Sequence, residues 1–97
     1  MAPRTSNLYG KIIISKRAIR HVVLLTCKDT YGVALAPKVK VRTEGTNIEV
    51  SISLYLRFGV TIEPVIESIR RATKYNVETF TGMTASVVNI DVLGIKM

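Results

Sequence analysis

Residues 48–58 alternate strictly between large apolar side chains and polar or amphipathic ones. The apolar members of this pattern are Ile48, Val50, Ile52, Leu54, Leu56 and Phe58. A period of two predicts a β-strand with one buried face and one wetter face. Because a slip of one residue would turn the whole apolar set toward water, the same pattern also determines the register of this strand.

Three further segments are predicted to be strands. Residues 39–43 alternate in the same way, and the turn-forming residues 44–47 join them to the long strand as a β-hairpin. Residues 8–14 end in three consecutive isoleucines and predict a short first strand. Residues 85–95 carry apolar side chains on both faces, which predicts a strand in the interior of the sheet or one covered on its second face.

A first helix is predicted from Ser15 to about Thr30. The Ser15 hydroxyl is suited to accept a free backbone N–H of the first turn. Apolar residues recur at helical spacing and form a stripe toward the core. This stripe comprises Ile19, Val22, Val23 and Cys27, with Thr26 beside it. Gly32 and Pro37 then indicate a connection over residues 31–38, whose apolar content predicts that it packs on the sheet or on a partner.

A second helix is predicted from the neighbourhood of Pro64, which suits a first turn, to Gly82, which suits a left-handed stop. Its predicted apolar stripe comprises Val65, Ile66, Ile69, Ala72, Val77 and Phe80, with Thr73 and Asn76 at its edge. Two pairs spaced i, i+4 are predicted on its outer face, and these pairs are Glu67 with Arg71 and Lys74 with Glu78.

The order of these elements predicts an α+β fold with two layers, β-α-β-β-α-β, in which two amphipathic helices pack on one small mixed sheet. Residues 8–97 are expected to form a single domain after a flexible N-terminus of residues 1–7. A ferredoxin-like split βαβ arrangement is the default for this order, and other strand orders stay open.

The charge of the chain is uneven. Residues 1–42 hold nine basic residues and one acid, whereas residues 43–97 hold five basic residues and six acids. A local excess of positive charge indicates an acidic partner or simply serves solubility. The candidate contact residues for a partner or an anion are Arg17, Arg20 and Lys28 on the first helix and Lys40 and Arg42 on the second strand.

No catalytic or metal-binding constellation is evident in the sequence. His21 is the only histidine, no ordering motif surrounds it, and one Cys with one His supplies too few metal ligands. Cys27 lies on the apolar stripe, which favours a buried thiol over a nucleophile. We therefore expect no enzymatic activity, no cofactor and no small-molecule substrate. The single Cys and the polar N-terminus favour a cytoplasmic location.

Several short motifs, taken in order, resemble a known protein family. They are Tyr9-Gly10-Lys11-Ile12-x-Ile14-Ser15, Tyr55-x-x-Phe58-Gly59-Val60, Thr81-Gly82 and Val87-Val88-Asn89-Ile90-Asp91-Val92-x-Gly94-Ile95. Together they resemble the alkaline shock protein family, also called the envelope stress response family, of Gram-positive and related bacteria. The resemblance spans residues 8–96, although the net charge of +7 is unlike the acidic character of many members.

This resemblance implies a non-enzymatic cytoplasmic scaffold or partner-binding protein associated with cell-envelope stress or homeostasis. Such a protein acts through protein–protein association or self-association, in some members beneath the membrane through an anchoring partner. An anionic membrane surface is a further expected contact. The alternative is a small basic domain that binds nucleic acid through the Lys and Arg residues of the first helix and second strand.

Overall fold

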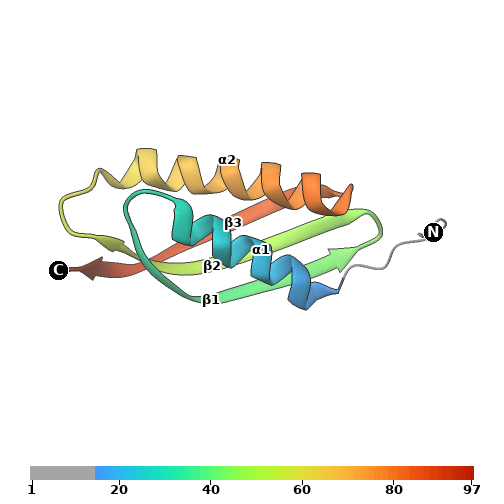
Figure 1. Ribbon diagram of the computed structural model, residues 1–97, viewed down its shortest axis with the longest axis horizontal. Coiled ribbons are helices and arrows are strands. Elements are labelled where there is room, and N and C mark those ends of the chain that lie inside the picture. Colours follow the sequence, from blue (N-terminus) through green and yellow to red (C-terminus); the bar gives the residue numbers. More distant parts are fainter. Residues whose placement is uncertain (1–14) are drawn as a thin grey trace.

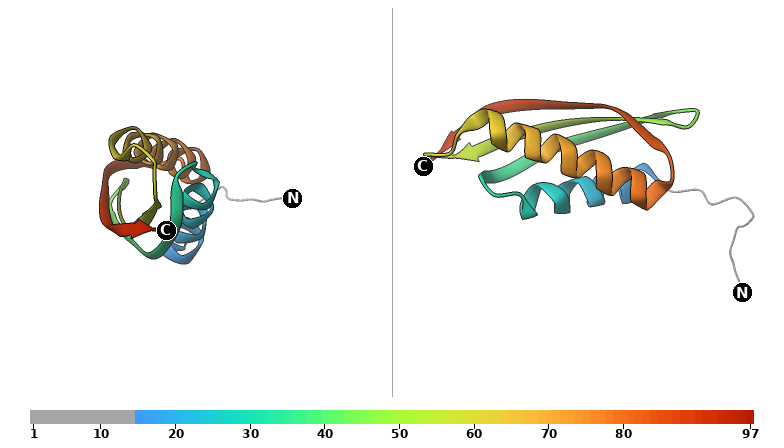
Figure 2. Two further views of the ribbon diagram at one scale, coloured as in Figure 1. Left: turned by 90° about the vertical axis from the view of Figure 1, so that its left-hand side faces the viewer. Right: turned by 90° about the horizontal axis from the view of Figure 1, so that it is seen from above.

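The computed structural model describes residues 15–97 and shows two helices on one face of a three-stranded sheet (Figures 1 and 2). The elements are α1 (Lys16–Asp29), β1 (Val33–Glu44), β2 (Asn47–Arg57), α2 (Ile62–Thr81) and β3 (Thr84–Lys96). This arrangement confirms the predicted α+β fold. The predicted first strand, residues 8–14, and the predicted flexible residues 1–7 lie outside the described residues.

The sheet is mixed, with β2 in its centre. β1 and β2 form the predicted antiparallel hairpin, in which Glu44 pairs with Asn47 across the turn. β2 and β3 pair in parallel and are connected by α2. The split βαβ default is wrong, because β3 lies directly beside β2 with no strand between them. The 20 residues of α2 carry the chain about 30 Å back along the sheet, so that β3 can pair with its immediate neighbour.

The inward face of β2 forms the centre of the core. Its fully buried side chains are Ile48, Val50, Ile52, Leu54 and Leu56. The alternation predicts that Phe58 continues this set, but 69% of Phe58 is exposed. The strand ends at Arg57, and Gly59 takes a φ of 91°, so the chain turns before Phe58 can reach the inner face.

α1 packs its predicted apolar stripe on β1. The Ser15 hydroxyl accepts the backbone N–H of Ala18 at 3.1 Å, as expected for an N-cap. Ile19, Val23 and Cys27 are buried beneath the helix, which ends at Asp29. Asn76 Nδ2 of α2 donates to Thr26 Oγ1 of α1 at 2.9 Å. This hydrogen bond joins the two helices above the sheet.

The predicted connection over residues 31–38 is wrong, because β1 already begins at Val33. Its first half pairs irregularly with β2, with shifts of register on both sides of Leu35. Pro37 lies in this irregular part, which an edge strand tolerates because the lost N–H donor is not needed by a neighbour. Gly32 has a φ of 96°, and a Cβ there would lie 2.9 Å from Val65 Cγ2. A glycine is therefore required at this close approach to α2.

α2 follows the predicted helix closely at both ends. Pro64 lies in its first turn, and Gly82 ends it in the left-handed conformation with a φ of 74°. Phe80 belongs to the predicted buried stripe but is 46% exposed, because it lies in the last turn beyond the edge of the core. The buried residues of α2 are Val65, Ile69, Thr73 and Val77.

Two ion pairs lie on α2. Lys74 Nζ and Glu78 Oε2 are 2.8 Å apart, which confirms this predicted pair. Both side chains also hydrogen-bond to Ala85, so the pair faces β3 and not the outer side as predicted. Glu67 pairs with Arg70 at 3.0 Å and not with Arg71 as predicted. The i, i+3 spacing is as compatible with helical geometry as the i, i+4 spacing.

Within residues 15–97, β3 lies at an edge of the sheet. Its inward residues Val88, Ile90 and Val92 are half-buried. On its other side, 36% of Val87 and 46% of Leu93 are exposed. The predicted first strand, residues 8–14, lies outside the described residues. The prediction that β3 lies in the interior of the sheet or is partly covered on its second face therefore stays a prediction.

Candidate functional site

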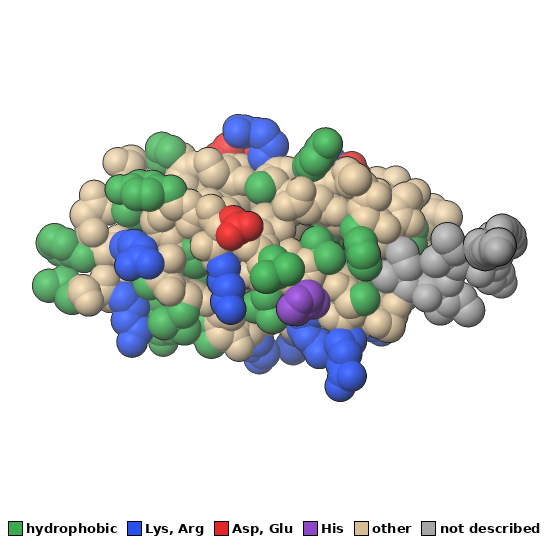
Figure 3. Space-filling view, in the orientation of Figure 1, with side chains coloured by type: hydrophobic (Ala, Val, Ile, Leu, Met, Phe, Trp, Pro, Cys, Tyr) green, Lys and Arg blue, Asp and Glu red, His purple; other side chains and the backbone are tan. Residues whose placement is uncertain are grey.

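The five predicted contact residues lie on α1 and β1, and all of them are exposed. Figure 3 shows Lys and Arg side chains along its lower border, which α1 and β1 form in this orientation. We call the surface formed by Arg17, Arg20, Lys38, Lys40 and Arg42 the basic edge.

Three of the predicted residues lie around one hollow. Arg20 of α1 and Lys40 and Arg42 of β1 line a depression of about 450 Å³, together with Glu49 and Ser51 of β2. The hollow wraps around the free side of β1, because Arg20 lies on the helical side whereas Lys40 and Arg42 lie on the helix-free face. Three cations with one acid give this hollow a positive potential, which favours an anionic ligand.

One of these cations is already paired. Arg42 Nε lies 3.8 Å from Glu49 Oε1 on the neighbouring strand, directly across the hairpin. Both side chains are open to solvent, so this pair stabilises the fold by at most about 1 kcal/mol. An anionic ligand can therefore compete for Arg42 at little cost.

Lys28 lies apart from this group. It lines a second hollow of about 360 Å³, together with Arg57 and apolar residues from the end of α1 and the irregular start of β1. Cys27 lies at the same place and is buried. Burial raises the pKa of the Cys27 thiol to about 11, so the thiol stays protonated and is a poor nucleophile at neutral pH.

Sequence reasoning missed two cations of these surfaces. Lys38 alternates with Lys40 and Arg42 along β1 and pairs with Ser53, although the preceding Pro37 indicates a connection there. Arg57 is recognised in the sequence only as one of the polar positions of β2. The period of two running back from Arg42 to Lys38 is the signal that could have found Lys38.

Within residues 15–97, no group of three or more His, Cys, Asp or Glu side chains is placed to hold a metal ion. Neither α1 nor α2 is both long and apolar enough to cross a membrane. His21 is exposed on α1.

Comparison with solved structures identifies the same architecture in the CTD of MamM. A zinc form of this domain has a TM-score of 0.61 over 84% of this chain and 87% of that chain. A copper form has a TM-score of 0.62 over 84% of this chain and 100% of that chain. Both are 15% identical to this chain, so the likeness concerns the fold alone.

The sequence itself matches known proteins. An uncharacterized protein of Streptococcus pyogenes serotype M6, Spy1614, is 31% identical over 94 residues, which are 95% of this chain and 74% of the relative. Residues 34–97 match the profile of the alkaline shock protein family, which is described as having a cell envelope-related function. This match confirms the resemblance seen in the sequence motifs. The chain therefore belongs to the alkaline shock protein family, and its role is related to the cell envelope.

Proposed function

We propose that the protein is a non-enzymatic adaptor at the cytoplasmic side of the cell envelope, which binds an acidic segment of a partner protein through the basic edge. The membership of the alkaline shock protein family supports the envelope-related role. The observation that carries the choice of surface is the hollow at β1. There, the consecutive elements α1 and β1 place Arg20, Lys40 and Arg42 around one hollow.

The chemistry of this hollow suits a flexible acidic segment. Exposed cations steer an anionic partner toward the surface and set its orientation, and they contribute less to the final affinity. Ser51 adds a hydroxyl that can donate to a carboxylate. Because the cations are open to water, the association should weaken as the ionic strength rises.

A pull-down from the cytoplasm of the source cell tests this proposal. The full chain serves as the bait beside two variants with the same change of charge, Arg17→Glu/Arg20→Glu on α1 and Arg70→Glu/Arg71→Glu on α2. We expect the native chain and the α2 variant to recover one defined partner, and the α1 variant to lose it at least tenfold. Circular dichroism checks that both variants fold, since all four side chains are exposed.

Two results would contradict the proposal. Equal recovery of the partner by the α1 variant would show that the basic edge is not the contact surface. If the native chain recovers no partner under any condition, the proposed adaptor function is wrong.

A second candidate function is the binding of nucleic acid. It is favoured by the stripe of Lys38, Lys40 and Arg42 along β1, since cations at regular spacing neutralise phosphates. The open face of the sheet offers little for base stacking. Tyr55 lies there, but Lys96 Nζ already lies 5.5 Å from the centre of its ring. A mobility-shift assay with pools of RNA and DNA at about 50 mM salt decides this question, because non-specific binding is strongest at low salt. No shift there excludes it.

A further inference from the structure

Among the described residues, β3 forms the second edge of the sheet, on the side opposite the basic edge. It is 13 residues long and holds two charged residues, Asp91 near its centre and Lys96 at its end. An edge strand leaves the backbone N–H and C=O groups of every second residue without a ladder partner. A long apolar edge of this kind is a template for another strand.

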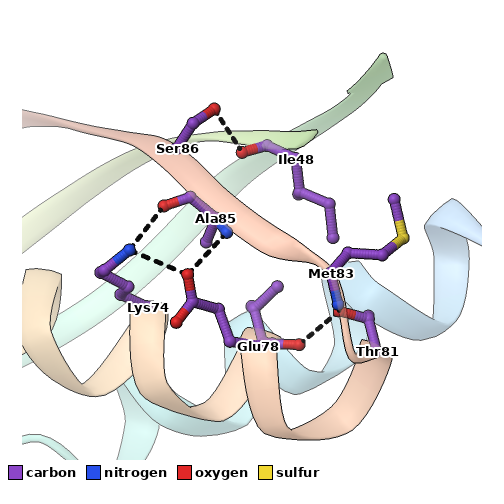
Figure 4. A network of polar contacts seen from close by, with 8 residues as sticks. Ile48, Lys74, Glu78, Thr81, Met83, Ala85 and Ser86 are labelled. Atoms are coloured by element: carbon purple, nitrogen blue, oxygen red, sulfur yellow. Dashed lines mark hydrogen bonds and ion pairs between the residues drawn. The ribbon is translucent and has the colours of Figure 1, made fainter. Parts of the chain in front are cut away.

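The beginning of β3 is fastened to α2 by side chains, as Figure 4 shows. Glu78 Oε2 accepts the backbone N–H of Ala85 at 2.9 Å, and Lys74 Nζ donates to the Ala85 carbonyl at 3.3 Å. These two contacts satisfy the edge groups of a single residue. In the part of the chain that the structure describes, no side chain hydrogen-bonds to the backbone of residues 87–92. Among residues 15–97, nothing occupies the central stretch of this edge.

We propose that β3 pairs in antiparallel orientation with β3 of a second copy of this chain, around a two-fold axis at Ile90. In this register Val88 of one copy lies opposite Val92 of the other on the inner side of the sheet. On the outer side Asn89 lies opposite Asp91, and Val87 lies opposite Leu93, which stands at the shift of register that ends the regular stretch of β3. Such cross-strand pairs are the stabilising unit of a sheet, and the same patch serves both copies.

The side-chain pattern of β3 is complementary to itself in this register. The half-buried Val88, Ile90 and Val92 would be covered by their counterparts, and the exposed Val87 and Leu93 would cover each other. An amide, which can donate a hydrogen bond, faces each Asp91 carboxylate. Moving the axis to Asp91 would place two carboxylates directly opposite, which destabilises a strand pair. The charge pattern thus favours the axis at Ile90.

The other edge of the sheet does not offer the same pairing. On β1, Pro37 and the irregular register interrupt the ladder, and Lys38, Lys40 and Arg42 would face like charges in a second copy. Association through β3 alone closes after two copies and joins the two sheets into one continuous sheet. The two basic edges then lie at opposite ends of that sheet.

This inference goes beyond the proposed adaptor function and is separable from it, because the two surfaces lie on opposite edges. Light scattering coupled to size-exclusion chromatography of the full chain provides the test. We expect a dimer for the native protein. The variants Val87→Lys/Leu93→Lys and Val87→Glu/Leu93→Glu should each be monomeric, because like charges face each other twice in each pair of copies.

An equimolar mixture of the two variants is the decisive sample. Lysines of one variant then face glutamates of the other, and we expect the dimer to return as a mixed pair. The matched control is Leu35→Lys, which places a lysine at an exposed leucine of the β1 edge and should leave the dimer intact. A monomeric native chain at the highest soluble concentration overturns the inference. So does a mixture that stays monomeric although both variants are folded.

A second measurement covers the case in which a variant fails to fold. Chains with Asn89→Cys are mixed with chains carrying Asp91→Cys and are oxidised without denaturant. Opposite residues of an antiparallel pair have Cα atoms about 4.5–5.5 Å apart, a separation that a disulfide spans. We expect a cross-linked dimer from the mixture and much less from either chain alone. No enrichment of the mixed cross-link overturns the register, and no cross-link overturns the pairing.

Discussion

The two edges of the sheet differ although they border the same central strand. β1 carries a proline, an irregular register and three cations at alternating positions. β3 is longer by one residue, has no proline and presents apolar side chains on both faces, and its register with β2 shifts only near its two ends, at Ser86 and Leu93. Charged residues, prolines and bulges are the means by which proteins prevent strand addition at an edge.

This difference is consistent with the two separate roles that we propose for the edges. The cations of β1 prevent pairing with a strand of like charge and at the same time attract an acidic ligand. β3 has shifts of register at Ser86 and Leu93, but the stretch between them pairs regularly with β2 and holds one charged residue, Asp91. One small sheet can therefore separate the contact with a partner from the contact with a second copy. β2 supports both edges, because its five buried side chains hold the core beneath them.

The largest effect on stability is expected from a change in β2, because both edges pack against this strand. Leu54 is fully buried in the middle of β2, and Leu54→Ala should lower the free energy of unfolding by about 2–5 kcal/mol through lost burial and a cavity. Chemical denaturation measures this loss. Ser51→Ala on the exposed face of β2 is the control and should change stability by less than about 0.5 kcal/mol. Equal effects of the two changes would mean that β2 is not the shared core.

An effect of intermediate size is expected from a variant that removes the difference between the two edges. The triple variant Lys38→Thr/Lys40→Thr/Arg42→Thr keeps strand-forming residues on β1 but deletes its repelling charges. We expect β1 to accept strands as well, so that the mass measured by light scattering rises beyond that of a dimer. Lys16→Gln/Arg17→Gln/Arg20→Gln removes the same charge from α1 and should leave the mass unchanged. A triple β1 variant with unchanged mass would show that these cations do not protect the edge.

The smallest effect concerns the fastening of β3 to α2. Hydrogen bonds from Lys74 and from the Ala85 N–H lower the pKa of Glu78 below its ordinary value. A lowered pKa in the folded state means that the ionised carboxylate stabilises the fold. This contribution is fully present above the ordinary pKa of Glu and is lost as the pH falls through the lowered pKa. Glu78→Gln should remove this part of the acid dependence of stability.

Thermal unfolding between about pH 3 and pH 7 measures this dependence, in the range where carboxylates titrate. Glu67→Gln is the matched control, because Glu67 has an ion pair on the same helix but no hydrogen bond from β3. If both variants reduce the loss of thermal stability at low pH equally, the hydrogen bond to Ala85 has no special role. The side chain of Glu78 is one-third exposed, so the effect should be modest.

The sequence predicted the core well where one periodicity applied over a whole element. The alternation of residues 48–56 identified every buried side chain of β2, and Ser15 and Gly82 marked helix boundaries correctly. Predictions failed at places where the chain changes direction. Phe58 keeps the alternation but lies beyond the last residue of the strand, and Pro37 indicated a connection although an edge strand accepts it.

The sequence also did not predict which residues far apart in the chain become neighbours in the fold. The apolar residues Val87 and Leu93 do not show whether another strand lies beside β3, because the pattern of one strand carries no such information. In the same way, the sequence named Arg20, Lys40 and Arg42 as candidates but did not show that they share one hollow. It also grouped Lys28 with them, although that residue lies at the other end of α1. Such groupings depend on how α1 lies across β1, which local periodicity does not determine.

The parallel pairing of β2 and β3 also has a consequence for the order in which the molecule folds. β1 and β2 are neighbours in sequence and meet through a tight turn, so their hairpin can form early. β3 reaches β2 only after the chain has closed a long loop that contains α2. Until then, the apolar strand β2 has one unpaired side. The time that α2 needs to dock therefore sets how long a newly unfolded or newly made chain is exposed to misassembly.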